Sequence, residues 1–254
     1  IVSLNGVGIG WPLISEGCDD SIEEELLFSL KEFSIKKNCD EIIINLKVPS
    51  IDNRELLRRK LKITSLGYIT SITSNHISMI NSWEINVRKR YKRYVRKFSK
   101  ILKISIINSE NLVNPENLAK EYMKLHISDS GMQTRNYDSY FKQVQFIKEG
   151  EAFFVKATNI KTNNTEGMLL ITTINNHAFD NSVATTEEGK KIFVSHVMKN
   201  EAFQYLNKII IISFNLGSDY TYASKEYIPT KKQIGISNFK DGWCGGNRDY
   251  FFVS

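Results

Sequence analysis

The sequence predicts an α/β fold (mixed α+β). A partial unit comes first in the chain, and a complete unit of the same kind follows it. Two patterns carry this prediction. Three consecutive strand-like segments after residue 150 are joined by short polar turns and are followed by a helix and a fourth strand. A strand, loop, helix and strand order also occurs twice, in residues 41–73 and in residues 208–237, with little sequence identity between the copies.

The composition excludes several classes of protein. The 254 residues are 41% hydrophobic and 24% charged, which is typical of a chain that folds around a sizeable core. Collagen-like, disulfide-rich and disordered proteins are thereby excluded. The chain contains no apolar run that approaches the ~20 residues of a membrane span, and we expect a cytoplasmic, bacterial protein.

Residues 1–82 are expected to form the partial unit. Its first helix, Ser21–Lys36, has apolar residues at helical spacing and acids in its first turn, where they complement the helix dipole. Asp52 is placed to cap a second helix that ends near Ser65. Strands are expected at residues 1–9, 41–48 and 68–73.

A basic helix at residues 83–103 is expected to connect the two units. Residues 86–103 hold nine Lys and Arg residues and no acid, which leaves 25 basic against 28 acidic residues elsewhere, so this segment accounts for the net charge of +6. One interpretation is a solvated helix face. The other is a phosphate-binding surface formed by Arg90, Arg93 and Lys97, for a phosphate-bearing precursor, a nucleic acid or an anionic membrane.

Residues 104–254 are expected to form the complete unit. Asn114 and Pro115 are typical of a helix start, and Gly131 and Gly150 of helix ends. The strands are expected at residues 104–108, 152–158, 168–175, 177–184, 209–214, 234–239 and 250–253, and the helices at 114–130, 137–149, 192–206 and 220–227. The helix at 192–206 makes a right-handed crossover between two parallel strands. This order resembles the GNAT acyltransferase fold.

Two GNAT-like units in tandem resemble the FemAB family of peptidoglycan interpeptide-bridge aminoacyltransferases. Four segments are similar to that family in the same order: GVGIGWPL at 6–13, WEINVRKRYKRYVRKFSK at 83–100, SGMQTRNYDSYF at 130–141 and ISNFKDGWCGG at 236–246. The resemblance implies transfer of an acyl or aminoacyl group to an amine of a cell-envelope or polysaccharide precursor. It also implies aminoacyl-tRNA or acyl-CoA as co-substrate, with no tightly bound cofactor.

The same resemblance implies binding residues. Arg135, Tyr140 and Lys240 would hold the phosphate or carbonyl of the precursor, and Lys240 would also stabilise the oxyanion. Asp180 interrupts an apolar strand, so it is either a catalytic base or a solvent-facing acid. Trp243 either lines a sugar or base site or packs in the core.

The donor site departs from that of ordinary GNAT enzymes. In those enzymes a glycine-rich turn at a helix N-terminus binds the CoA pyrophosphate. The matching loop here, ATTEEGKKIFV, offers Gly189, Lys190 and Lys191, but two adjacent glutamates would repel the anion. The sequence therefore disfavours acyl-CoA as the donor but does not exclude it.

No Ser-His-Asp or Cys-His pattern is visible, and the scattered cysteines and histidines have no ligand-like spacing, so no metal is expected. Two alternatives remain open. One is an acyl-CoA-dependent N-acyltransferase acting on a nucleotide-linked amino sugar. The other is a non-catalytic phosphate- or nucleic-acid-binding module on a degenerate GNAT fold.

Overall fold

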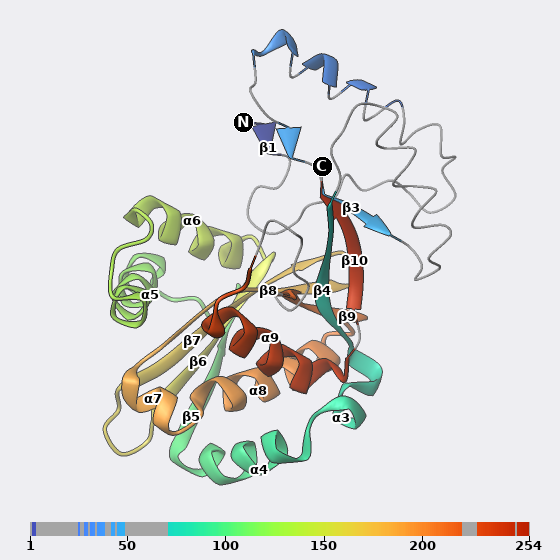
Figure 1. The fold of residues 1–254 in the computed structure, drawn as a ribbon. Coiled ribbons are helices and arrows are strands. Elements are labelled where there is room, and N and C mark those ends of the chain that lie inside the picture. Colours follow the sequence, from blue (N-terminus) through green and yellow to red (C-terminus); the bar gives the residue numbers. More distant parts are fainter. Residues whose placement is uncertain are drawn as a thin grey trace. The chain divides into compact units, whose positions relative to one another are not determined.

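A computed structural model describes residues 71–219 and 228–246 continuously, together with short segments within 2–48 and 248–253 (Figure 1). The chain divides into two compact units. The smaller contains Ile1–Asn75, Ser218–Ser237 and Arg248–Ser254, and the larger contains His76–Gly217 and Asn238–Asn247. The expected boundaries at residues 82 and 103 stay a prediction. Segment 6–13 and the expected helices at 52–65 and 220–227 lie outside the described residues.

The described residues of the smaller unit include two strand pairs. Strand β1 (Val2–Ser3) runs parallel to β2 (Ile42–Ile43), and β3 (Asn45–Val48) runs antiparallel to β10 (Arg248–Val253). The residues described within the expected helix at 21–36 are helical.

The larger unit is built on a mostly antiparallel sheet with the strand order β4-β9-β8-β7-β6-β5. Strands β5 to β8 pair antiparallel in sequence, and β8 pairs parallel with β9 through the crossover helix α8 (Val194–Lys208). The expected mixed α/β fold class and the crossover connection are thereby confirmed. The strands are β4 (Ser71–Met79), β5 (Leu102–Ile107), β6 (Ala152–Asn159), β7 (Thr165–Ile174), β8 (His177–Thr185) and β9 (Ser213–Ser218).

The two faces of this sheet carry separate hydrophobic clusters. Alternate residues of a strand point to opposite faces, and Phe153 and Leu169 join one cluster while Phe154 and Leu170 join the other. Helices α5 (Pro115–Ser130) and α6 (Tyr137–Lys148) pack on the second cluster. Helices α4 (Lys89–Phe98) and α8, with part of α9 (Lys231–Cys244), pack on the first (Figure 1).

The helix ends of α5 follow the sequence signals. The side chain of Asn114 accepts a hydrogen bond from the N–H of Asn117 at 3.0 Å, which satisfies one of the free amides of the first turn. Gly131 ends the helix in the left-handed conformation, with φ of 75°. None of the helices in the described part of the chain is long and apolar enough to cross a membrane.

The basic helix is shorter than expected. Helix α3 (Trp83–Asn86) precedes it, α4 ends at Phe98, and a 3-10 turn (Ser99–Ile101) leads into β5. Leu102, the last member of the expected apolar stripe, is buried at the start of that strand. Leu102 fitted the helical spacing of the apolar residues before it, although it lies in a strand. A helix and a strand can each direct an apolar side chain at this position into the same core.

Two boundaries around the crossover were wrong. The segment at 187–190, expected to be a loop, is helix α7 (Glu187–Lys191), separated from α8 by Phe193 with φ of 52°. The strand expected at 209–214 is β9 at 213–218. Ile209–Ile212 form the turn before it, in which Ile210 has φ of 60°.

The strand expected at 234–239 was also wrong, because these residues belong to α9. Thr230 and Gln233 form a reciprocal capping box before this helix: the N–H of Thr230 donates to Oε1 of Gln233 at 2.8 Å, and the N–H of Gln233 donates to Oγ1 of Thr230 at 3.3 Å. Gly242 lets α9 approach α4 closely, since a Cβ there would lie 2.2 Å from Cε2 of the buried Tyr91.

Candidate functional site

The sheet of the larger unit opens between its two parallel strands. Only His177–Phe179 of β8 pairs with Ser213–Asn215 of β9, although β8 continues to Thr185 and β9 to Ser218. Beyond the paired part, side chains supply partners for backbone groups of both strands: the N–H of Gly217 donates to Oδ1 of Asn215 at 2.8 Å, and the N–H of Thr185 donates to Oδ2 of Asp129 at 2.9 Å. We call this region the strand opening, and the candidate site is built around it.

A β-bulge in β8 sends two neighbouring polar side chains to different faces at the strand opening. Asp180 pairs with Ile171 and Ser182 with Leu170, which leaves Asn181 as the extra residue. Without the bulge, Asp180 and Ser182 would share a face. With it, Asp180 lies on the α8 side of the sheet, as does its partner Ile171. Ser182 lies on the side of α5 and α6, as does its partner Leu170.

Asp180, the candidate base, is held in a buried ion pair. Its Oδ2 lies 2.5 Å from Nζ of Lys199 on α8, and the side chains are only 13% and 5% exposed. The Lys199 ammonium also lies 5.0 Å from the ring centre of Phe214. The carboxylate therefore already has a strong partner, and a catalytic role for Asp180 stays a prediction.

Two aromatic residues that sequence reasoning did not select, Tyr122 and His126, gather with the selected Tyr140 on the other face. Tyr122 and His126 lie one turn apart on α5, and Tyr140 joins them from α6, with ring centres 5.7–6.0 Å apart and edge-to-face packing. We call these three residues the tyrosine–histidine cluster. Within the described residues, the Tyr140 hydroxyl and Nδ1 of His126 are buried without a hydrogen-bonding partner.

Charge and burial shape the protonation of this cluster. Burial raises the pKa of Tyr122 to about 12, although the Ser182 hydroxyl and the charge of Arg135 oppose the change. Burial also lowers the pKa of His126, and Arg135 lowers it further, with Asp129 acting in the opposite direction. The cluster therefore favours neutral side chains next to one cation. The signal that could have found it is the i, i+4 spacing of Tyr122 and His126.

The charge of Arg135 acts on Tyr122 and His126, so Arg135 lies near the cluster that contains Tyr140. The binding roles of Arg135 and Tyr140 stay a prediction. Arg135 is in the loop before α6, whose cap is Asn136, and it is partly exposed. Because it precedes the helix, its five-residue spacing from Tyr140 does not have to fit one helix face. Tyr140 itself is fully buried, so it packs within the cluster rather than presenting a surface.

Lys240 lies on the other side of the strand opening. It is on α9, and a Cβ at Gly217 would come within 2.9 Å of its Nζ, so Gly217 leaves room for the ammonium at the end of β9. Gly217 has φ of 86°, a conformation that favours glycine. The Arg135 loop and this part of α9 belong to opposite faces of the sheet. Binding of the precursor by Arg135 together with Lys240 stays a prediction.

Trp243 packs in the core. It is fully buried and stacks on Phe203 with ring centres 5.6 Å apart and an interplanar angle of 21°. This is the packing alternative that the sequence left open for this residue.

The turn before α7, where a CoA pyrophosphate would bind in a GNAT enzyme, is closed by the protein's own groups. The N–H of Thr185 donates to Oδ2 of Asp129 at 2.9 Å, that of Thr186 to the carbonyl of Glu166 at 3.0 Å, and that of Gly189 to Oγ1 of Thr186 at 2.8 Å. A Cβ at Gly189 would lie 2.4 Å from the carbonyl oxygen of Glu166. Gly189 is therefore explained by close packing, without a phosphate.

The two lysines of this turn are also engaged. Lys190 pairs with Asp129 at 2.8 Å and with Glu187 at 2.6 Å, and Lys191 pairs with Glu188 at 2.5 Å. Hydrogen bonds that Lys190 donates to the Asp129 and Glu187 carboxylates raise its pKa. The carboxylates of Asp129, Glu187 and Glu188 thus bind amide and ammonium groups of this turn that could otherwise bind a pyrophosphate.

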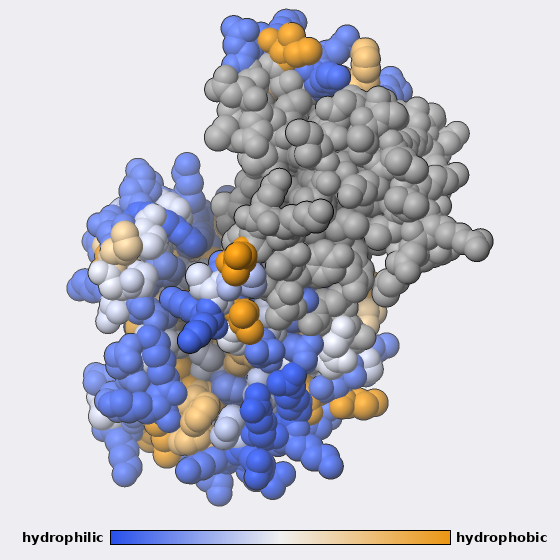
Figure 2. All heavy atoms as spheres, viewed as in Figure 1, coloured by the Kyte–Doolittle hydropathy of each residue, from blue (hydrophilic) through white to orange (hydrophobic). Residues whose placement is uncertain are grey.

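Helix α4 presents a continuous cationic surface. We call its six exposed cations the basic face: Lys89, Arg90, Lys92, Arg93, Arg96 and Lys97. Figure 2 shows hydrophilic residues gathered at the bottom of the view, where Figure 1 places α4. Within the described residues, no carboxylate pairs with any of the six. Like charges without counter-charges favour binding of a polyanion.

A partly buried histidine beneath α4 makes the fold sensitive to acid. His196 packs among Tyr91, Tyr94, Phe193 and Phe239, and burial, with a smaller effect of Arg90, lowers its pKa from 6.5 to about 4. As the pH falls from about 6.5, the unfolded chain therefore takes up a proton before the folded protein does. We expect the free energy of unfolding to fall by about 3 kcal/mol between pH 6.5 and pH 4 on account of this residue.

The variant His196→Phe should remove this component, since phenylalanine suits an aromatic environment and does not titrate. Urea denaturation at pH 7.5, 6, 5 and 4 checks it. The loss of stability with falling pH should be smaller in the variant. Parallel curves for the two proteins would contradict the assignment.

Comparison with known proteins identifies the fold. No family model matches the sequence, and no curated protein matches it significantly. Solved structures do match. FemX is similar with a TM-score of 0.62 and 14% identity, covering 91% of this chain and 76% of that one. L-PGS from Bacillus licheniformis is similar with a TM-score of 0.60 and 10% identity, covering 90% and 72%.

A tandem GNAT protein from the clavulanic acid biosynthesis pathway is similar with a TM-score of 0.57 and 12% identity, covering 95% of this chain and 72% of that one. The chain therefore has a GNAT-like fold, as the element order indicated. A shared fold at this identity does not by itself assign an activity.

Proposed function

We propose that this protein is an aminoacyltransferase of the FemAB type, which moves an aminoacyl group from aminoacyl-tRNA to an amine of a cell-envelope or polysaccharide precursor. The observation that carries the choice of donor is the closed turn before α7. Its amides at Thr185, Thr186 and Gly189 are bound by Asp129, Glu166 and Thr186, so a CoA pyrophosphate that used them would have to displace the protein's own acceptors. The fold, shared with FemX, supports the class of reaction.

The basic face supports the choice of tRNA. Six exposed cations on one short helix, without acidic partners among the described residues, suit the regularly spaced phosphates of a nucleic acid. A CoA molecule, with three phosphate groups, would engage only part of such a surface.

The reaction needs no protein nucleophile. The neutral amine of the precursor attacks the ester carbonyl carbon of the aminoacyl group, a C–N bond forms, and the C–O bond to the tRNA ribose breaks. The amine loses a proton and the ribose oxygen gains one, so an amide and a free tRNA end result. Holding both substrates in one place supplies much of the rate.

The residues around the strand opening divide the work in this proposal. Arg135 binds an anionic group of the precursor, because a guanidinium can hold two oxygens at once. Lys240, beside Gly217, stabilises the negative oxygen of the tetrahedral intermediate. The ion pair of Asp180 and Lys199 fixes the bulged strand that borders the opening. Lys190 and Lys191 keep the α7 turn closed.

The test offers the purified protein a radiolabelled aminoacyl-tRNA pool and, separately, radiolabelled acyl-CoA, each with amine-bearing nucleotide-linked and lipid-linked precursors. We expect label to move to a precursor only from aminoacyl-tRNA. Arg135→Ala should lower the rate, whereas Lys142→Ala, which removes an exposed cation from nearby α6, should not.

Two results would overturn the proposal. Saturable transfer from acyl-CoA would establish the N-acyltransferase alternative, in which the α7 turn must open. Binding of tRNA without transfer to any precursor would favour the non-catalytic nucleic-acid-binding module.

A further inference from the structure

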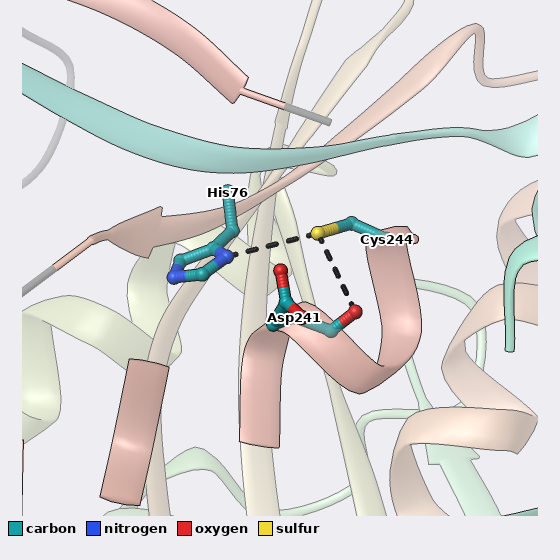
Figure 3. Close-up of side chains that lie close together, drawn as sticks. All are labelled: His76, Asp241 and Cys244. Carbon is teal, nitrogen blue, oxygen red and sulfur yellow. Dashed lines mark hydrogen bonds between the residues drawn. The ribbon is translucent and has the colours of Figure 1, made fainter. Parts of the chain in front are cut away.

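A histidine, an aspartate and a cysteine, none of them assigned above to the reaction, meet inside the larger unit. His76 comes from β4, and Asp241 and Cys244 come from the last turns of α9 (Figure 3). One ligand atom of each residue lies within 4.8 Å of the others. His76 and Cys244 are 168 positions apart in sequence, so no linear motif could reveal the cluster.

The spacing of the atoms fits a tetrahedral metal centre. Sγ of Cys244 lies 3.7 Å from Nδ1 of His76. Two ligands at about 2.3 Å (sulfur) and about 2.05 Å (nitrogen) from a zinc ion, at a tetrahedral angle, are separated by about 3.5 Å. The side chains are thus already near the separation that a metal imposes, without movement of β4 or α9.

The chemistry of the three donors selects the metal. A thiolate, an imidazole and a carboxylate together suit Zn²⁺, whereas Ca²⁺ and Mg²⁺ prefer oxygen ligands alone. The three residues are the ligands found among the described part of the chain, and a water molecule would complete a tetrahedral set. A nucleophilic role for Cys244 is disfavoured because Cys244 and His76 are both completely buried, and a substrate would have to reach the sulfur.

A neighbouring arginine orients the carboxylate. Arg88 donates to Oδ2 of Asp241 at 2.6 Å. Metal-bound carboxylates are commonly fixed in this way by a hydrogen bond to one oxygen. The same contact ties the start of α4 to α9, as does the bond from the N–H of Arg88 to the carbonyl of Gly242 at 2.9 Å.

We propose that His76, Asp241 and Cys244 form a Zn²⁺ site that fastens α9 to β4. The site is structural: it fixes the helix that carries Lys240. The donors come from a strand and from a helix far apart in sequence, so a metal ion joins them in the folded chain and not in the unfolded one. Zinc binding should therefore stabilise the fold.

The test uses the full-length protein, stripped of metal with a chelator and titrated with Co²⁺ as a spectroscopic probe for Zn²⁺. We expect one equivalent to bind, with a near-ultraviolet thiolate-to-cobalt absorption and the visible bands of a tetrahedral ion, and Zn²⁺ to displace it. Zn²⁺ should also raise the thermal midpoint. Absence of the thiolate absorption at one equivalent would overturn the proposal.

Variants show which thiol is the ligand. Cys18→Ser with Cys39→Ser should leave the absorption intact, because the proposal assigns the thiolate ligand to Cys244. Cys244→Ser should abolish it. The reverse pattern would refute the site.

Asp241→Asn covers the case in which Cys244→Ser does not fold, since it retains the shape of the side chain. This variant should lower the affinity for Zn²⁺ by at least roughly 10–100-fold, which is the loss seen when only a residue that hydrogen-bonds to a metal ligand is replaced. Unchanged affinity in folded Asp241→Asn would exclude this carboxylate as a ligand and with it the three-residue site. Transfer activity is not the readout, so failure here would leave the proposed function untouched.

Discussion

Replacing Lys199 with methionine is expected to lower the free energy of unfolding by about 3–5 kcal/mol. The substitution keeps the length of the side chain but leaves Asp180 charged, 13% exposed and without its partner at 2.5 Å. Removing one member of a buried pair costs far more than the pair contributes, because the remaining charge is poorly solvated. Guanidinium denaturation of the wild type and the variant at pH 7.5 measures the difference.

The double variant Asp180→Leu with Lys199→Met is the control. It removes both charges, so most of the lost stability should return. A loss below about 1 kcal/mol in Lys199→Met would show that the pair is solvated and not buried.

The same double variant separates the two roles open to Asp180. If the ion pair only fixes the bulged strand, a stable double variant should keep a substantial part of its transfer activity. If Asp180 is a catalytic base, activity should disappear although the fold is retained. Stability and activity measured on one protein thus decide between a structural and a chemical aspartate.

Local sequence signals predicted the elements that local interactions determine. The cap at Asn114, the left-handed Gly131 and the three strands within residues 152–185 appear close to where the sequence placed them. Each signal acts within a few residues: a side chain that accepts from the first turn, a residue without Cβ, or a strand-like segment bounded by polar turns.

Elements that depend on distant contacts could not be predicted in the same way. Residues 234–239 are β-branched in part, but the capping box at Thr230 and the approach of Gly242 to Tyr91 hold them in a helix. Leu102 continued a helical stripe, yet pairs with Asn159 as the first residue of β5.

In the candidate site, too, the residues could be predicted from the sequence, but their distant contacts could not. The resemblance pointed to Arg135 and Tyr140, which both lie by the tyrosine–histidine cluster. It could not show the partner of Asp180, because a single extra residue, Asn181, decides which face of β8 that side chain occupies. Nor could it show that Asp129, from the end of α5, bonds to the turn before α7.

Neutralising the basic face should weaken tRNA binding strongly. Arg90, Arg93 and Lys97 are spaced three and four residues apart, so they share one side of α4, and all three are exposed. Replacing them together with glutamine should remove up to three phosphate contacts. In a plot of log affinity against log salt concentration, the slope should become shallower by about one unit per lost contact. At low salt the affinity should fall on the order of 100-fold or more.

The measurement is fluorescence anisotropy of labelled tRNA at four salt concentrations and pH 7.5. The fold should survive, because exposed charges away from the core change stability by roughly 0.5 kcal/mol or less. The matched control replaces Lys124, Lys142 and Lys148 with glutamine, which removes the same total charge from exposed positions of α5 and α6. An equal loss of tRNA affinity in both variants would show that tRNA binding depends only on net charge. An unchanged salt dependence in the α4 variant would show that the basic face is a solvated surface that does not bind tRNA.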